Sequence, residues 1–193
     1  MLFHTSTYVE RRMHLRKQVG SGVVLLFGNN DSPMNYPANT YKFRQDSSFL
    51  YFYGQHRDGL IGFIDIDNER EILFGDEIDI DDIVWYGSVT SVMEMAKESG
   101  VPNHLPMSKL ESFLETVRKE GRKIHFLPPY RHETQIRIMD LLGIHPSKQR
   151  ISASLDLIHA VIKLRSVKTA EEIEELERAC NIGYEMHTTA MRL

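Results

Sequence analysis

The polar residues Arg44, Gln45 and Asp46 form the stretch of this chain whose residue types are best suited to chemistry. They follow Tyr41 and come directly before the aromatic run 49–53. Charged and amide groups cost free energy to bury unless they find partners. Either these side chains hold the chain through internal salt bridges and helix caps, or they form a polar wall that faces a substrate cleft. The sequence leaves both readings open.

Trp85 is the only tryptophan and lies between an acidic run, residues 76–82, and Gly87. A lone tryptophan usually belongs to a core. The acidic neighbours make a position on the rim of a cleft the alternative. The acidic run lacks the sixth-position glycine and the final glutamate of an EF-hand loop, so it reads as a solvated loop and not as a calcium site.

Other patterns of catalytic or metal-binding residues are missing. The nine histidines include no His-Glu-x-x-His pair, and no Gly-x-Ser-x-Gly elbow occurs. Cys180 falls on an apolar helix face, where cysteine is typically a small hydrophobe. Arg11 and Arg12 read as a solvated helix face. Alone, therefore, the chain has no catalytic residue set and no metal ligand set that the sequence can identify.

Composition narrows the class of protein. A length of 193 residues indicates one domain, with an appendage at most. The net charge of −4 and the scattered basic residues argue against a nucleic-acid partner. A single cysteine excludes an internal disulfide and fits a reducing compartment. No signal peptide is visible, and the longest early apolar run, 23–27, is too short to cross a membrane. We expect a cytoplasmic protein.

The pattern of elements predicts an α/β fold, a mixed β-sheet flanked by helices. Apolar and turn residues predict strands at 23–27, 49–53 and 123–126, and a hairpin formed by 60–65 and 71–74. Helices are expected at 7–19, 88–99, 108–120 and 132–142. Threonine or serine three residues ahead of glutamate, at Thr7 and Ser108, predicts a capping box for two of them. The long polar loop 28–40 is of the kind that often serves function.

The last forty residues predict a helix capped by Ser154 and then a long helix opened by a Thr169–Glu172 capping box. The long helix carries one apolar stripe: Ile173, Leu176, Cys180, Gly183, Met186, Ala190 and Met191. Such a stripe needs a covering surface. It either packs back on the same domain or meets a second domain or another subunit.

Three segments, 8–15, 41–54 and 164–173, resemble in order and spacing the amino-terminal half of a Xaa-Pro aminopeptidase (aminopeptidase P, of the creatinase and prolidase group). The resemblance implies that 1–165 form the family's amino-terminal α/β domain. It also implies that 166–193 are the first helix of a truncated pita-bread catalytic domain. The family's metal ligands match no residue of this chain.

The resemblance implies a function as well. The parent enzyme would use two manganese ions to remove the residue that precedes a proline in second position of a peptide. This chain would be inactive alone, would bind no cofactor itself, and would contribute to a homo-oligomer. Trp85 is similar to a tryptophan that covers the active site, and Tyr41, Arg44, Gln45 and Asp46 match a cleft-wall segment. The alternative is a non-catalytic, peptidase-like module that binds peptides or proteins.

Overall fold

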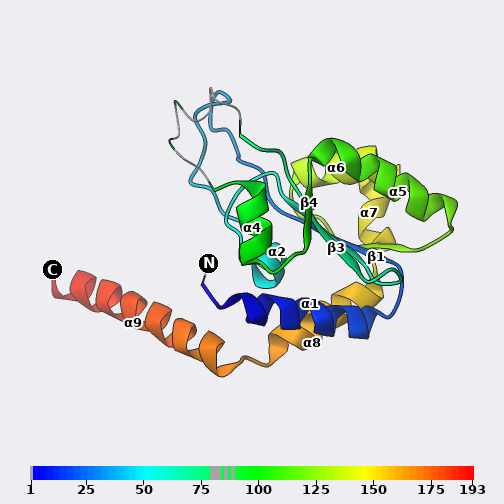
Figure 1. Ribbon diagram of the computed structural model, residues 1–193. Helices are drawn as coiled ribbons and strands as arrows, with labels where there is room; N and C mark the ends of the chain where they lie inside the picture. The colour runs from blue at the N-terminus through cyan, green and yellow to red at the C-terminus, as the bar shows by residue number, and fades with distance from the viewer. Residues whose placement is uncertain (1, 79–83, 85–86, 88–89) are drawn as a thin grey trace.

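A computed structural model describes residues 2–78, 84, 87 and 90–193 (Figure 1). Its centre is a five-stranded sheet in the order β4-β3-β2-β1-β5. The strands are β1 (Val23–Phe27), β2 (Ile61–Asp65), β3 (Arg70–Phe74), β4 (Asn103–Leu105) and β5 (Ile124–Phe126). β1, β2 and β3 pair antiparallel, whereas β4 and β5 add in parallel at the two edges. The predicted mixed sheet flanked by helices is confirmed.

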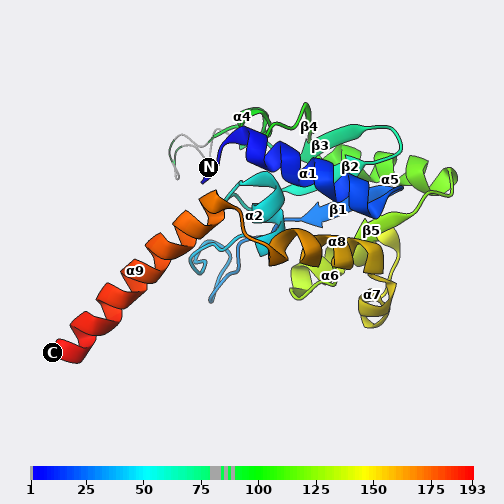
Figure 2. The ribbon, with the colours of Figure 1, turned by 90° about the horizontal axis from the view of Figure 1, so that it is seen from below.

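Helices cover both faces of the sheet. α1 (Thr5–Val19), α2 (Ser47–Tyr53), α4 (Val92–Glu98) and α8 (Leu155–Ser166) contribute to the core on one face. α5 (Leu110–Lys119) packs on the other face with the end of α6 (His132–Leu142), and α7 (Pro146–Ser152) lies beside α6. α1 and α8 run side by side beneath the sheet (Figure 2). Alternate residues of β1 point to opposite cores because side chains alternate along a strand.

The predicted strand at 49–53 is wrong: this segment is the helix α2. The Asp46 carboxylate accepts hydrogen bonds from the backbone N–H groups of Ser48 and Phe49, which caps the first turn. Gly54 ends the helix in the left-handed conformation. Phe49 and Tyr53, one turn apart, stack at 4.9 Å between ring centroids. Capping and helical burial outweigh the strand preference of the aromatic residues.

Three predicted helix starts also differ from the structure. The helix predicted at 88–99 is α4, which begins at Val92, because Ser91 and Glu94 form a capping box there. α1 begins at Thr5 because His4 accepts from the backbone N–H of Ser6, so the Thr7 capping box does not form. The segment before α5 is a short 3-10 helix, Met107–Lys109, and no side chain caps α5. β4 and α7 were not predicted at all.

Arg12 ties α1 to the rest of the body and is fully buried, so the reading of Arg11 and Arg12 as a solvated face is wrong. Its Nε donates to the Glu71 carboxylate at 2.8 Å. Its other nitrogens donate to the carbonyl oxygens of Phe52, Ser99 and Gly100 at 2.8–3.1 Å. One side chain therefore joins α1 to β3 and to the ends of α2 and α4.

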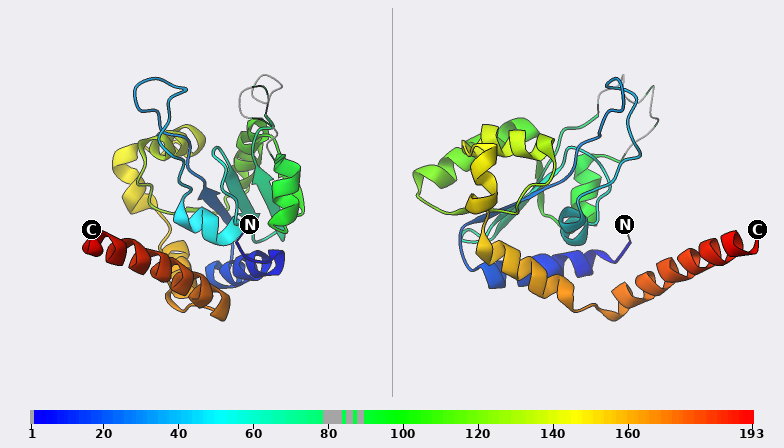
Figure 3. Two further views of the ribbon diagram at one scale, coloured as in Figure 1. Left: turned by 90° about the vertical axis from the view of Figure 1, so that its left-hand side faces the viewer. Right: turned by 180° about the vertical axis from the view of Figure 1, so that it is seen from behind.

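The last helix, α9 (Ala170–Arg192), leaves the body (Figures 1 and 3). Its predicted capping box is confirmed, with Thr169 and Glu172 bonded reciprocally. No residue of α9 is buried, and Cys180 is exposed. The apolar stripe does not pack back on the domain. Among the described residues, no helix is long and apolar enough to cross a membrane.

Candidate functional site

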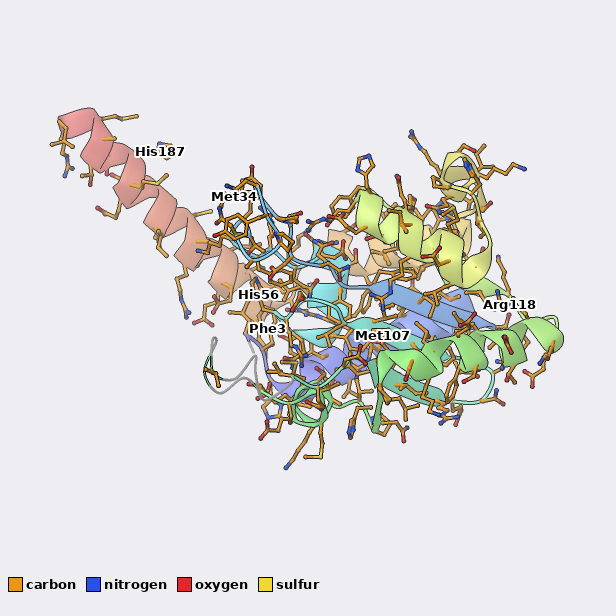
Figure 4. All side chains as sticks on the ribbon, turned by 90° about the horizontal axis from the view of Figure 1, so that it is seen from above. Phe3, Met34, His56, Met107, Arg118 and His187 are labelled. Carbon is orange, nitrogen blue, oxygen red and sulfur yellow. The ribbon has the colours of Figure 1, made fainter. Side chains whose placement is uncertain are left out.

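A groove of about 1190 Å³ separates the body from the first turns of α9. Residues from the chain start, from α1 and α2, and from the junction of α8 and α9 line it, among them Phe3, Arg11, Tyr51, Arg165, Glu172 and Leu176. Figure 4 shows Phe3 and His56 near the point where α9 leaves the body. A concavity of this size with mixed apolar and charged walls is a candidate binding surface.

Arg11 forms the most organised part of the groove. Its guanidinium carbon lies 4.0 Å from the ring centroid of Tyr51 and 4.8 Å from that of Phe3, distances at which a cation is attracted to an aromatic face. Its Nη1 donates to the Tyr51 carbonyl at 2.8 Å. Its Nη2 pairs with the Glu172 carboxylate at 3.0 Å. Only 7% of the Arg11 side chain is exposed, so this cation is held away from water.

The junction of α8 and α9 is tied to α2 as well. The Tyr51 hydroxyl donates to the carbonyl of Leu164 at 3.1 Å, and Arg165 donates to the Ser48 hydroxyl at 3.2 Å. Burial is the main cause that raises the pKa of Tyr51 above its ordinary value, so its hydroxyl stays protonated near neutral pH and remains a donor. The end of α8 is thereby fixed relative to α2.

The mouth of the groove is polar. Asp31, His56 and Asp58 lie there, and the His56 ring meets the edge of Phe43 at 5.1 Å. Burial, and next the negative charge of Asp58, raise the pKa of Asp31 above its ordinary value. Arg57, between His56 and Asp58 in the chain, also lines the groove, so the lining carries both negative and positive groups.

The structure separates the predicted site residues. The buried Gln45 accepts from the backbone N–H of Asn29 at 2.7 Å and donates to the Arg57 carbonyl at 2.6 Å. Asp46 caps α2. For Gln45 and Asp46 the internal reading therefore holds, because both fasten the long loop to the body. Tyr41 and Arg44 are exposed. None of these residues is among the described residues that line the groove.

Part of the chain matches a known protein family. The aminopeptidase P, N-terminal domain, family matches residues 8–125, which is more than half of the chain. The chain belongs to the aminopeptidase P family. The matched range begins within α1 and ends within β5, so it includes the complete sheet apart from the last residue of its edge strand.

Individual relatives agree with this placement in the aminopeptidase P family. A probable Xaa-Pro aminopeptidase of Metarhizium acridum is 24% identical over 190 residues, which are 95% of this chain and 36% of the relative. Aminopeptidase PepP of Pseudomonas aeruginosa shares the fold with a TM-score of 0.80 at 22% identity, over 99% of this chain and 45% of that one. Aminopeptidase P of Escherichia coli gives 0.77 at 23%, over 98% and 45%. The chain thus spans less than half the length of these relatives.

Because aminopeptidase P is a metal-dependent family, we asked whether residues of this chain could hold a metal ion. Across the described residues, no group of three or more His, Cys, Asp or Glu side chains is arranged to hold a metal ion. The described residues therefore do not fit a metal centre, and no catalytic step can be assigned to them through a metal. Trp85 lies outside the described residues, and its place on the cleft wall of an aminopeptidase P stays a prediction.

Sequence reasoning missed the residues that organise the groove. Tyr51 lies 40 residues after Arg11, and the two meet because α1 packs against α2. Asp46 ahead of the run and Gly54 after it are helix start and stop signals that could have revealed α2, and with it the position of Tyr51. No local pattern could have paired Arg11 with Glu172, 161 residues later.

Proposed function

We propose that this chain is the non-catalytic, amino-terminal domain of a metal-dependent Xaa-Pro aminopeptidase, which removes an N-terminal residue preceding proline. The match of residues 8–125 to the family's N-terminal domain carries the proposal. In the proposed parent, a pita-bread domain that begins at residue 166 would hold two manganese ions, whose chemistry would be to activate a water and to polarise the peptide carbonyl. One solved relative is described as zinc-substituted Escherichia coli aminopeptidase P in complex with product, which supports a metal-dependent family reaction.

The role proposed for this domain is to wall the substrate cleft. Trp85, Tyr41, Arg44, Gln45 and Asp46 are assigned to that wall by resemblance. Gln45 and Asp46 would contribute to the wall indirectly, because they hold the loop on which the exposed Tyr41 and Arg44 lie. In the parent enzyme, Trp85→Ala should lower peptide hydrolysis more than it lowers thermal stability.

The proposal is tested on the natural protein that contains this sequence. Antibodies against the chain would isolate that protein, its mass would be measured, and peptides with proline or alanine in second position would be offered with manganese. We expect chelator-sensitive cleavage of the proline peptide alone. The 193-residue chain by itself should give no cleavage above blank. A natural protein that is inactive under these conditions and contains no metal would favour a peptide- or protein-binding module instead.

We also propose that the parent is a cytoplasmic homo-oligomer. The exposed stripe of α9 supports a further contact, because burying several such side chains contributes about 1.5–3 kcal/mol each. In the isolated chain, the helix should pair with α9 of a second molecule. Deletion of 169–193 should therefore convert a dimer to a monomer in sedimentation. Equal masses for the two forms would remove this part of the proposal.

A further inference from the structure

α9 is joined to the body by few side-chain contacts. No residue of the helix is buried, and Val167 in the connecting segment is 79% exposed. Within the described part of the chain, its hydrogen bonds to α1 come from Glu171, which accepts from the Thr7 hydroxyl at 3.2 Å, and from Glu172, which accepts from Arg11. Apolar packing therefore does not set the direction of α9. Directional polar contacts must do so.

The body holds Arg11 in place without help from α9. The rings of Phe3, Tyr8 and Tyr51 surround the guanidinium at 4.0–5.5 Å, and its Nη1 is fixed by the Tyr51 carbonyl. A planar guanidinium restrained in this way directs its remaining N–H groups along defined lines. The Nη2 group meets Glu172, whose side chain is only 15% exposed. The binding site for the Glu172 carboxylate is thus formed by residues of the body and not by α9.

Glu172 transmits this constraint to the helix. Its Oε1 accepts from Arg11, while its Oε2 accepts from the backbone N–H of Thr169 at 2.8 Å within the capping box. The carboxylate is therefore rigid with respect to the first turn of α9. Glu171 next to it makes the second contact, with Thr7. Two contacts from adjacent residues fix a direction, whereas one would leave a pivot.

We propose that Arg11 is a positioning residue, whose aromatic-held guanidinium fixes, through Glu172, the direction in which α9 leaves the α/β body. The proposal extends the proposed function, and it rests on that function only in one consequence. If α9 leads into a catalytic domain, the same contact sets how that domain faces the cleft wall. The contact itself is a property of this chain and can be measured on it.

The measurement uses the single cysteine. A spin label on Cys180 of α9 and a second on Met93→Cys of α4, both exposed, report the separation of helix and body by pulsed electron resonance. The labelled starting chain is diluted in an excess of unlabelled chain, so that pairing of two α9 helices adds no distances between molecules, and it should then give one narrow distance distribution. Glu172→Gln keeps an amide oxygen for the Thr169 cap but loses the charge. We expect the ratio of displaced to native orientations to rise on the order of tenfold, the usual effect of losing one charge-assisted hydrogen bond.

Glu175→Gln is the matched control, because Glu175 lies one turn further along and pairs with Arg178 of the same helix at 3.1 Å. It should leave the distribution unchanged. Arg11→Lys keeps the charge but loses the planar fork, so it should broaden the distribution, and adding Glu172→Gln should then broaden it less than the same change does in the starting chain. Urea unfolding of Glu172→Gln should stay cooperative, with a loss of free energy of unfolding no larger than the tenfold ratio implies, about 1.4 kcal/mol.

Two results would overturn the proposal. One is a Glu172→Gln distribution as narrow as that of the starting chain. The other is equal broadening by Glu175→Gln, which would show that helix charge and not the Arg11 contact is responsible. Neither result involves peptide hydrolysis, so a failure here would leave the proposed peptidase role standing, and a failure of that role would leave the contact standing.

Discussion

Removal of the buried Arg12 guanidinium should destabilise the body more than any other single charge deletion on α1. Arg12→Met fills a similar space but leaves the Glu71 carboxylate, which is 9% exposed, without its 2.8 Å partner. It also leaves the carbonyl oxygens of Phe52, Ser99 and Gly100 without their donor. Breaking one side of a buried ion pair typically costs about 3–5 kcal/mol. Domains have about 5–15 kcal/mol in total, so the variant should be marginally stable.

Arg16 provides the matched control. It approaches the same Glu71 carboxylate at 3.6 Å, but its side chain is 28% exposed. Exposed ion pairs contribute about 0–1 kcal/mol, so Arg16→Met should lower the free energy of unfolding by no more than that. Urea titrations followed by circular dichroism give both values by linear extrapolation. If Arg12→Met does not yield folded protein, Arg12→Lys keeps the charge and serves as the milder variant.

The effects of substituting Arg12 and Glu71 should also depend on each other. Arg12→Met combined with Glu71→Leu should cost less than the sum of the two single changes, because neither charge is then buried alone. A loss below about 1 kcal/mol for Arg12→Met, indistinguishable from Arg16→Met, would refute the reasoning, since it would mean that water or local movement replaces the missing donor.

Three further predictions concern titration and packing. Burial, and next the charge of Lys123, lower the pKa of His125 below its ordinary 6.5. The free energy of unfolding should therefore fall as pH drops below 6.5, and His125→Asn should make that pH dependence weaker. Burial would raise the pKa of Asp65, but hydrogen bonds from Arg122 and Asn68 outweigh it and hold the pKa below its ordinary 3.8. Asp65→Asn should therefore destabilise the body at neutral pH, and the difference should vanish as pH falls through the folded pKa. Gly62→Ala should cost about 1–3 kcal/mol, since its new methyl would lie 2.2 Å from the Tyr53 ring.

His125→Asn and Gly62→Ala each have a matched control variant in the chain. His132→Asn, at the exposed start of α6, should keep the slope that His125→Asn loses, and a slope unchanged in both would contradict the assignment. Asp65→Asn at neutral pH should match the starting chain only if the Arg122 contact at 2.6 Å contributes nothing. Gly183→Ala on α9 meets no atom within 4 Å and should be neutral or slightly stabilising, so a Gly62→Ala variant as stable as Gly183→Ala would be decisive. Urea titrations serve for all of them.

Local signals in the sequence were enough for most of the sheet. The continuous apolar run of β1 and the hairpin of β2 and β3 form at the predicted places, because burial on both faces leaves β-rich runs little alternative. The Thr169 capping box formed for a similar reason, since both of its bonds lie within one turn. Other local patterns failed, because the capping boxes predicted at Thr7 and Ser108 do not form: His4 caps α1, and a 3-10 helix precedes α5.

Partners that are distant in sequence could not be predicted. Arg11 donates to the carbonyl of Tyr51, 40 residues later, and pairs with Glu172, 161 residues later. The strand prediction for the aromatic run 49–53 was wrong for a local reason, because the Asp46 cap and the Phe49–Tyr53 stack outweigh the strand preference of its residue types. Gln45 belonged to the polar run that the sequence singled out, but its hydrogen bonds depend on where the 28–45 loop returns to the body. The sequence located a structured polar segment correctly, and it could not tell which members of that segment face inward.

Arg11 and Arg12 show how one dipeptide comes to serve two purposes. Neighbouring side chains on a helix point about 100° apart. Because Arg12 enters the body between β3 and the ends of α2 and α4, Arg11 points along the flank of α2. There it meets Tyr51, which is itself placed by the α2 cap at Asp46. The groove beside α9 thus depends on the same polar run that the sequence marked. Asp46 acts on that groove by starting the helix that carries Tyr51, without lining the groove itself.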